Sequence, residues 1–573
     1  MGTSPRTIAS TEAKWSKQTW HRKATKPVTL WLLALVIAGL IHPLLPEFRW
    51  VLIHLFTLGA ITNSIVVWSQ YFTEKLLELH IPDSQRGPQL LKIRILNAGI
   101  IVTLAGQLLS QAFAQHWIIT SLGALLISGA LLWHALSLAQ QLLNAPRGQR
   151  YRSAIVAYVA SASCLPFGAL AGGFLAKELS NTWQERVVLA HVIINILGFV
   201  GFAALGSLSF LFGRVWHTAP SKDYTRFSVA LMVPSLPIMV AGALFNQGYV
   251  AAAGLILYTF AWLLGIFSWA RIVLEACQDP GDRINFAAAS VATAPLWLLG
   301  SLIYLIIQTL SHPDTLFHLS PPTLALLIGF GAQLLFGVMS YLLPATMGGG
   351  EAAIRTGTYR VNVAGLFRWT LLNGGLLIWL STENSWLRVC ASLLSIGALV
   401  AFIPLLATAV KAQRGVITKK RTAAPLQERS HFNQITAGIS ALALLIACFG
   451  GLNPDSSNSS TTINTPAPGE LNDNTYAITI SAGNLIFTPK IIEVPAGAIL
   501  EVTLVNEDTM VHDLKFANGV RTGRVAPGEK ATITVGQITT DMEGWCTIAG
   551  HRAQGMVLNV RVQDPNTGAE SAP

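Results

Sequence analysis

Three soft metal donors recur at equal spacing near the C-terminus of the chain. The stretch EGWCTIAGHRAQGM, residues 543–556, contains Cys546, His551 and Met556, each five positions after the one before. A type 1 copper centre needs two imidazoles and a thiolate in a trigonal plane, with a weak axial thioether. The second imidazole must come from a different strand, and His512, in TMVHDLKF, is the candidate. The pattern therefore predicts one type 1 copper ion bound by these four residues.

Other residues near this motif are weaker candidates for ligands. Met510 and Met542 could compete as the axial donor, although their placement in the sequence is poorer. Asp513 is expected to orient the backbone near His512 rather than to bind the metal. The alternative to a metal site is a polar loop with an incidental histidine. The ligand spacing, the upstream histidine and the surrounding strand pattern agree with one another, and this agreement favours the metal.

The segment that carries the motif has the pattern of a β-domain. Apolar and polar residues alternate with a period of two from residue 475 onward, as in ILEVTLVN and MVLNVRVQ, and turns such as VAPGE separate the runs. This predicts a β-sandwich of seven or eight strands over residues 475–562. The last residues, 563–573, read as a disordered tail. The sandwich contains only Cys546, so it cannot form an internal disulfide.

The rest of the chain has the composition of a membrane protein. The sequence has 573 residues, of which 52% are hydrophobic and 12% are charged, against roughly 25% charged in soluble domains. Thirteen apolar runs long enough to cross a bilayer follow one another in residues 28–452. They predict an α-helical membrane bundle that follows a basic tail, residues 1–27. A flexible tether, residues 453–474, then connects the bundle to the sandwich.

The distribution of basic residues predicts the orientation of the bundle. The N-terminal tail and the loops after even-numbered spans carry 26 Lys and Arg residues, whereas the loops after odd-numbered spans carry 4. By the positive-inside rule, the N-terminus is cytoplasmic. An odd number of spans then places the sandwich outside the cytoplasm. The net charge of +10 is accordingly interpreted as a topology signal and not as a sign of nucleic-acid binding.

Residues 475–562 resemble a cupredoxin domain, and GWCTIAGHRAQGM resembles the last copper-binding segment of multicopper oxidases and copper nitrite reductases. In those enzymes a histidine before the cysteine serves the catalytic copper, and in the oxidases a histidine also follows it. This chain has Trp545 and Thr547 at those positions. The resemblance therefore implies a type 1 centre without ligands for a type 2 or trinuclear site, so no catalytic residue is assigned.

The whole chain also resembles bacterial proteins in which a many-span region precedes a cupredoxin, sometimes followed by a copper nitrite reductase. HLFTLGAITNSIVVWS, INILGFVGFAALGSL and LLFGVMSYLLPATMGGG, from spans 2, 6 and 10, carry this likeness. The four-span spacing predicts three repeated four-helix units, with a last span leading to the sandwich.

This arrangement is similar to the catalytic subunit of haem-copper oxidases. His54 and His191 match two of its ligand positions, but span 7 has no histidine and span 10 offers only Gln333. A reduced haem site using His54, His191 or His134 is one alternative. The other is that these histidines form hydrogen bonds within the bundle or extend to the outer surface, and the broken ligand set favours it.

Three functions fit these observations. The first is electron transfer by a membrane-anchored blue copper protein, between a donor in the membrane and an extracytoplasmic acceptor. The second is a subunit or truncated relative of a copper nitrite reductase or multicopper oxidase whose catalytic copper lies on another chain. The third is copper handling, which predicts spans rich in methionine or cysteine. The chain has only eight Met and no Cys-x-x-Cys, so electron transfer is preferred.

Overall fold

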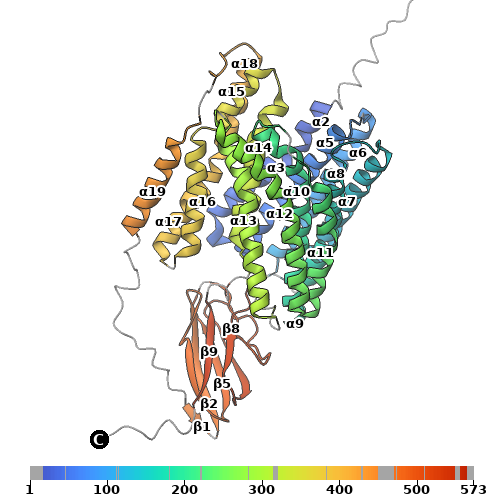
Figure 1. The fold of residues 1–573 in the computed structure, drawn as a ribbon. Coiled ribbons are helices and arrows are strands. Elements are labelled where there is room, and N and C mark those ends of the chain that lie inside the picture. Colours follow the sequence, from blue (N-terminus) through green and yellow to red (C-terminus); the bar gives the residue numbers. More distant parts are fainter. Residues whose placement is uncertain are drawn as a thin grey trace, which may run out of the picture. The chain divides into compact units, whose positions relative to one another are not determined.

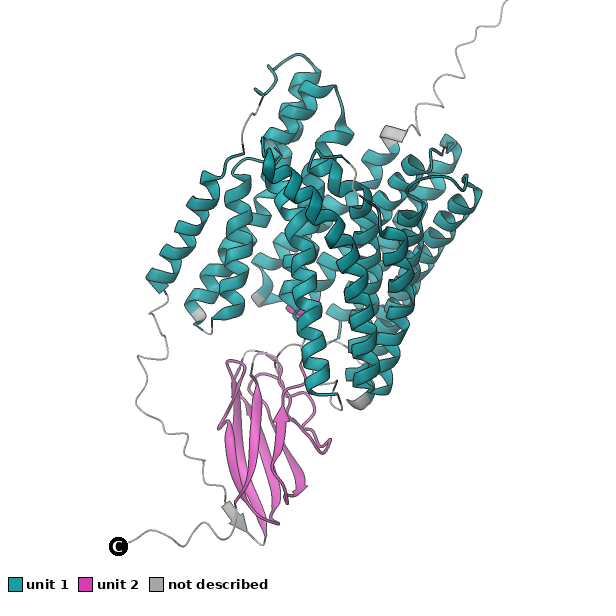
Figure 2. Cartoon of the chain, viewed as in Figure 1, with its two compact units in different colours: residues 1–46, 51–454 teal, residues 47–50, 455–573 magenta. Residues whose placement is uncertain are grey.

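The computed structural model of the chain describes residues 17–45, 47–79, 81–110, 113, 115–177, 179, 181–219, 222–281, 283–313, 316, 321–382, 384–426, 430–449, 470–472, 474–508, 510–548, 551 and 555–563. Two compact units result: residues 1–46 with 51–454, and residues 47–50 with 455–573 (Figure 2). The first is helical and the second is a β-sandwich. Most of the predicted basic tail, most of the predicted tether and nearly all of the predicted C-terminal tail lie outside the described residues.

The helical elements follow one another along most of the chain (Figure 1). In order they are α2 (Lys17–Ala24), α3 (Lys26–Leu40), η2 (His42–Leu44), α4 (Phe48–His54), η3 (Leu55–Thr62), α5 (Asn63–Leu76), η4 (Asp83–Gln85), α6 (Arg86–Leu108), α7 (His116–Asn144), α8 (Arg152–Ala176), α9 (Asn181–Val192), η5 (Ile193–Val200), α10 (Gly201–Val215), α11 (Thr225–Phe245), α12 (Gly248–Gln278), α13 (Phe286–Ser311), η7 (Ala325–Ala332), α14 (Gln333–Met347), α15 (Glu351–Val361), α16 (Gly365–Ser381), α17 (Ser385–Val400), α18 (Phe402–Ile417) and α19 (Asn433–Phe449).

Twelve helical stretches among the described residues are long and apolar enough to cross a membrane, which agrees with the first twelve predicted spans. The thirteenth prediction corresponds to α19, which has 17 described residues. At about 1.5 Å per residue, a helix of this length is shorter than the roughly 30 Å hydrocarbon core. The twelfth span consists of α17 and α18, which meet at Ala401. Pro404 explains this break, because it cannot donate a hydrogen bond to the carbonyl of Val400.

Spans 2, 6 and 10, whose sequences are alike, also share a helical irregularity. Each contains an eight-residue π-helical segment, namely η3, η5 and η7. Continuous α-helix follows each segment, as α5, α10 and α14. Long π segments are rare in helices. Their presence in three spans, four spans apart, gives the predicted internal likeness a counterpart in the backbone.

The first and third four-span groups also share a side-chain arrangement around these segments. A Cβ on Gly59 of η3 would lie 2.8 Å from Trp31, and one on Gly329 of η7 would lie 2.6 Å from Trp297. Glycine is therefore what lets each indole pack against the helix. Each indole then donates a hydrogen bond to an asparagine in the next span but one. Trp31 Nε1 donates to Asn97 Oδ1 at 2.6 Å, and Trp297 Nε1 donates to Asn373 Oδ1 at 2.7 Å.

The C-terminal sandwich has two sheets of short strands. One contains β1 (Glu470–Asn472), β2 (Thr475–Gly483), β5 (Ile499–Asn506) and β7 (Lys530–Gln537) in that order, with β3 (Ile486–Thr488) paired to β2. The other has the order β4 (Ile491–Pro495), β9 (Val557–Gln563), β8 (Met542–Trp545) and β6 (Lys515–Phe516). The β2–β5 and β4–β9 pairs are parallel, and the remaining pairs are antiparallel.

The period-two pattern explains the core of the sandwich. Along β5 the buried positions alternate with partly exposed ones, so Leu500, Val502 and Leu504 face inward. They share one core with Phe487 and Phe516. The prediction of a β-sandwich is confirmed, although β1 precedes the predicted start at residue 475. Pairing of Glu470–Asn472 with the first residues of β2 extends the sheet into the end of the predicted tether.

Candidate metal centre

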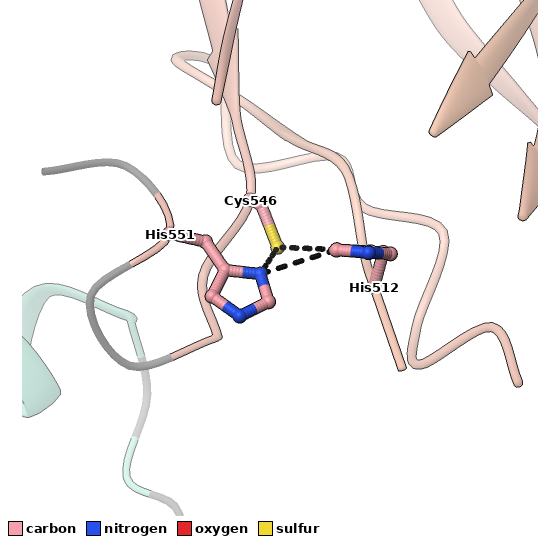
Figure 3. A group of neighbouring side chains, drawn as sticks. All are labelled: His512, Cys546 and His551. Atoms are coloured by element: carbon pink, nitrogen blue, oxygen red, sulfur yellow. Dashed lines mark hydrogen bonds between the residues drawn. The ribbon is translucent and has the colours of Figure 1, made fainter. Parts of the chain in front are cut away.

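The predicted histidines and cysteine of the sandwich meet at one end of its core. His512, Cys546 and His551 offer ligand atoms that all lie within 4.8 Å of one another. Cys546 Sγ lies 3.4 Å from His551 Nδ1 and 3.9 Å from His512 Nδ1, and the two Nδ1 atoms are 3.1 Å apart (Figure 3). All three side chains are buried. The fold therefore brings together three of the four residues that the sequence predicts as ligands.

The separations between these donors suit a metal ion in their plane. Bonds of about 2.0–2.1 Å to nitrogen and about 2.3 Å to sulfur, at trigonal angles, separate two nitrogens by roughly 3.5 Å. They separate sulfur from nitrogen by roughly 3.8 Å. The observed separations of 3.1, 3.4 and 3.9 Å lie within about half an ångström of these values. Two imidazoles and one thiolate can thus hold a metal ion with small adjustments of the side chains.

Backbone hydrogen bonds fix each donor to the sandwich. His512 lies in the connection after β5, and its N–H and carbonyl pair with Val525 at 3.1 and 2.7 Å. Cys546 directly follows β8, and its N–H donates to the carbonyl of Met556, the residue before β9. Met556 N–H in turn donates to the carbonyl of His551. These two hydrogen bonds tie Cys546, His551 and Met556 to one another.

Met556 is joined to Cys546 through the backbone and stays the predicted axial donor. Its side chain is fully buried in the same core as Cys546, and its carbonyl oxygen accepts from Cys546 N–H at 3.2 Å. Met542 instead begins β8, at the end of that strand away from Cys546. This difference favours Met556 over Met542 as the fourth ligand.

Two acidic residues support the donors from outside. His512 Nε2 donates to Asp508 Oδ2 at 3.0 Å, which leaves Nδ1 as the acceptor nitrogen that faces the cysteine. Asp513 accepts from the backbone N–H of Thr547 at 2.5 Å and from the hydroxyl of the same residue. The carboxylate therefore fixes the residue after the cysteine, which is the kind of backbone-orienting role expected of Asp513.

Asp508 and Asn506 are two residues that the sequence reasoning missed. Asn506 is fully buried and donates from Nδ2 to the carbonyls of Met510 and Val525, at 2.7 and 2.8 Å. It thereby fastens the loop that carries Asp508 and His512. A polar residue at an inward position of β5, followed two residues later by an acid, is the signal that could have identified this pair.

Burial sets the protonation states of the metal-free donors. It raises the pKa of the Cys546 thiol well above its usual range, and the nearby carboxylate of Asp513 adds to this effect. Burial, together with the neighbouring His512, lowers the pKa of His551 to about 4. The imidazole of His551 is accordingly neutral near pH 7 and able to bind a cation. The thiol must lose its proton when a metal binds.

The tryptophan before the cysteine is a packed residue. Trp545 is 7% exposed and pairs with Lys515 across the β6–β8 register. The ammonium of Lys515 lies 5.2 Å from the centre of the Trp545 ring, within the range of a cation–π interaction. The residue directly before Cys546 is therefore packed against the neighbouring strand β6.

The membrane histidines have other surroundings. The rings of His54 and His191 lie near each other, with centroids 6.4 Å apart, and His191 Nδ1 donates to the carbonyl of Gly168 at 2.9 Å. His134 uses both ring nitrogens. Lys92 Nζ donates to Nδ1 and Nε2 donates to Ser69 Oγ, each at 2.8 Å. For His134 this supports hydrogen bonding within the bundle over binding of haem.

The family model that matches this chain agrees with the β-sandwich. Residues 442–541 match the family model of the cupredoxin-like domain, a range that includes His512 and ends before Cys546. The structure of auracyanin B is similar, with 17% sequence identity, a TM-score of 0.14, and coverage of 15% of this chain and 88% of that chain. A structure of rusticyanin variants is similar at 20% identity, with a TM-score of 0.13 and coverage of 17% of this chain and 86% of that chain. No curated protein matches. The chain therefore combines a multi-span helical region with a C-terminal cupredoxin-like sandwich.

Proposed function

We propose that this chain is a membrane-anchored type 1 copper protein that transfers electrons. The convergence of His512 Nδ1, His551 Nδ1 and Cys546 Sγ at a buried point is the observation that supports this proposal most. Two imidazoles and one thiolate in a plane, with a methionine available as a weak fourth ligand, form the donor set of blue-copper electron-transfer sites. In this proposal His512, Cys546, His551 and Met556 are the ligands of one copper ion.

Copper bound at this site would supply a one-electron redox couple. The contribution of the protein is to keep the donors in place when the charge of the site changes. His512 is held by Val525 and Asp508, and Cys546 is held through Met556 and through Asp513 at the next residue. Donors that are fixed in advance need little rearrangement during electron transfer, which is the advantage of preorganised sites.

The membrane region defines where the electrons would move. The excess of Lys and Arg on one side of the spans places the N-terminus in the cytoplasm and the sandwich outside it, in our proposal. The donor would then be a redox component in the membrane and the acceptor an extracytoplasmic protein. Trp545 and Thr547 replace the histidines of catalytic copper sites. We therefore propose that any reduction of a small molecule occurs on a partner protein, such as a copper reductase or oxidase.

An absorption spectrum of the purified full-length protein tests this function. After loading with Cu²⁺, we expect a strong visible thiolate-to-copper band that disappears on reduction. The variant Cys546→Ser should lose this band, and the matched variant Cys277→Ser, at an exposed cysteine, should keep it. A copper-loaded protein without the band would contradict the proposal, as would a band that persists in Cys546→Ser. A Soret band in the same spectrum would report haem in the membrane region, where His54 and His191 are the candidates.

A further inference from the structure

A polar cavity lies among the helices of the membrane unit, beside the C-terminal half of α10, the start of α11 and the C-terminal half of α12. It has a volume of about 130 Å³, whereas one water needs roughly 10–15 Å³ on this measure. The C-terminal turn of α10, the connection from α10 to α11 and the α7–α8 connection form its walls. There is room for several waters or for a compact polar group.

Three basic residues line this cavity: Arg150, Arg214 and Lys222. The guanidinium groups of Arg150 and Arg214 each stack on an aromatic ring, 5.4 Å from the centre of Tyr151 and 5.8 Å from that of Phe210. None of the ion pairs found among the described residues involves these three cations. The cavity thus has a basic lining without matching acidic partners.

The one carboxylate in the lining is already engaged by the start of α11. Asp223 Oδ1 accepts from Thr225 N–H at 2.9 Å and from Thr225 Oγ1 at 2.5 Å. Asp223 lies just before the N-cap residue Tyr224, where a carboxylate can accept from the free N–H groups at the start of the helix. It offsets one of the three positive charges, so the lining keeps an excess of positive charge.

Buried hydroxyl groups in the same lining lack hydrogen-bond partners. Ser228, on the first turns of α11, is fully buried, and its Oγ makes no hydrogen bond among the described residues. Thr218 is partly buried, and its Oγ1 is also a buried atom without a hydrogen bond among the described residues. A buried hydroxyl without a partner costs about 1–3 kcal/mol, so these two donors indicate a polar occupant. By contrast, Ser268 Oγ donates to the carbonyl of Lys222 at 2.6 Å and holds this part of the connection in place.

We propose that this cavity binds a phosphate group, with Arg150, Arg214 and Lys222 at its rim and the hydroxyl of Ser228 at its floor. Guanidinium groups bind phosphate oxygens in pairs, and hydroxyl groups donate to the remaining oxygens. The cavity adjoins the connection from α10 to α11, on the side that the charge bias assigns to the cytoplasm. Basic pockets between spanning helices on that side bind anionic lipid headgroups. The phosphate can thus belong to a lipid headgroup or be free in solution.

Two probes distinguish these sources in full-length protein purified in a neutral detergent. The first is phosphatidylglycerol in mixed micelles, compared with diacylglycerol of the same chains, and native mass spectrometry counts the retained lipid. The second is inorganic phosphate, compared with chloride at equal ionic strength, and the shift in melting temperature measures its binding. Retention of phosphatidylglycerol identifies a lipid headgroup. Stabilisation by inorganic phosphate without lipid retention identifies a free anion.

The double variant Arg214→Gln with Lys222→Gln should bind the effective probe about 30-fold more weakly, because each basic residue near the surface contributes about fivefold. Arg271→Gln is the matched control. Arg271 is an exposed residue of α12 that stacks on Phe267 and does not line the cavity. Equal binding by the double variant and by the control would overturn the proposal. Failure of the wild-type protein to bind either probe would overturn it as well.

Ser228→Ala provides a second, milder test should the double variant fail to fold. It removes the buried hydroxyl and creates no new charge, so the variant should fold and elute from size-exclusion chromatography as the wild-type protein does. It should bind whichever probe the wild-type protein binds several-fold more weakly. Unchanged binding by Ser228→Ala would exclude the floor of the cavity as part of the site.

Discussion

In the sandwich, the Nδ1 atoms of His512 and His551 face each other and the sulfur of Cys546. In the membrane unit, both ring nitrogens of His134 form hydrogen bonds, one with Lys92 and one with Ser69. Both environments are buried. They differ in the partners of the histidine ring nitrogens. The sandwich leaves acceptor nitrogens directed at a shared point, which a cation can fill. The bundle satisfies its histidine with its own side chains, so the same residue type serves there as a hydrogen-bonding bridge.

The largest effect that would test this comparison is the loss of copper on removal of one sandwich histidine. His551→Ala takes away one of the three donors, so we expect copper affinity to fall by orders of magnitude and the visible band to disappear. Copper stoichiometry after dialysis measures this outcome. Retention of one copper ion per chain in His551→Ala would show that His551 is not a ligand.

His134→Ala should lower the stability of the protein and leave copper binding unchanged. It leaves Lys92 Nζ buried without its hydrogen bond to His134, and a buried polar group that loses its hydrogen-bond partner costs about 1–3 kcal/mol. We expect a lower melting temperature of the membrane region and an unchanged copper band. A loss of copper colour in folded His134→Ala protein would break the distinction between the two histidine environments.

Asp508→Ala sharpens the comparison, because it tests the support that the sandwich gives to a ligand. The carboxylate fixes the orientation of His512 through Nε2, and loss of such a partner typically lowers metal affinity by about 10–100-fold. Competition with a copper chelator measures the change. Glu507→Ala, at the preceding acidic residue, serves as the control and should retain the wild-type affinity. Equal copper affinities of the two variants would show that Asp508 does not support copper binding.

Met556→Leu should have the smallest effect. Leucine fills a similar volume in the buried core, so copper binding and the visible band should persist. Loss of the weak thioether donor disfavours the oxidised ion, so we expect the potential to rise by roughly 60 mV, which is a tenfold shift for one electron. Potentiometric titration of the band measures the shift. An unchanged potential would argue that the Met556 sulfur does not contact copper.

The sequence predicts the donors better than it predicts their supports. Equal spacing pointed to Cys546, His551 and Met556, because candidate ligands on one short connection leave a local signature. The structure brings Cys546 and His551 together with His512, and the role of Met556 stays a prediction. The alternation of apolar and polar residues located the strands, because it too is a local pattern. Asp508 escaped notice, because its contact with His512 depends on how the loop folds back and not on a residue pattern. The break between α17 and α18 was missed too, since hydropathy does not register the lost hydrogen bond of Pro404.

In the membrane unit, too, some features of the structure could not be predicted from the sequence. The likeness of spans 2, 6 and 10 is visible in the sequence, but their π-helical segments are not. Apolar content is the same for an α-helix and a π-helix. The pairing of Trp31 with Asn97, and of Trp297 with Asn373, joins residues 66 and 76 positions apart. Such pairs become evident only when the helices are packed.

The π-helical segments also constrain the length of these spans. An α-helix turns by about 100° per residue, and a π-helical segment takes up an additional residue without a break in the helix. Deletion of one residue within η3 would therefore let α-helix run through the span and would rotate α5 by about a quarter turn relative to α4. Asn63 and Ser69 would then leave the faces that contact Asn97 and His134. Homologous chains should accordingly tolerate substitutions within these three segments more readily than single-residue insertions or deletions.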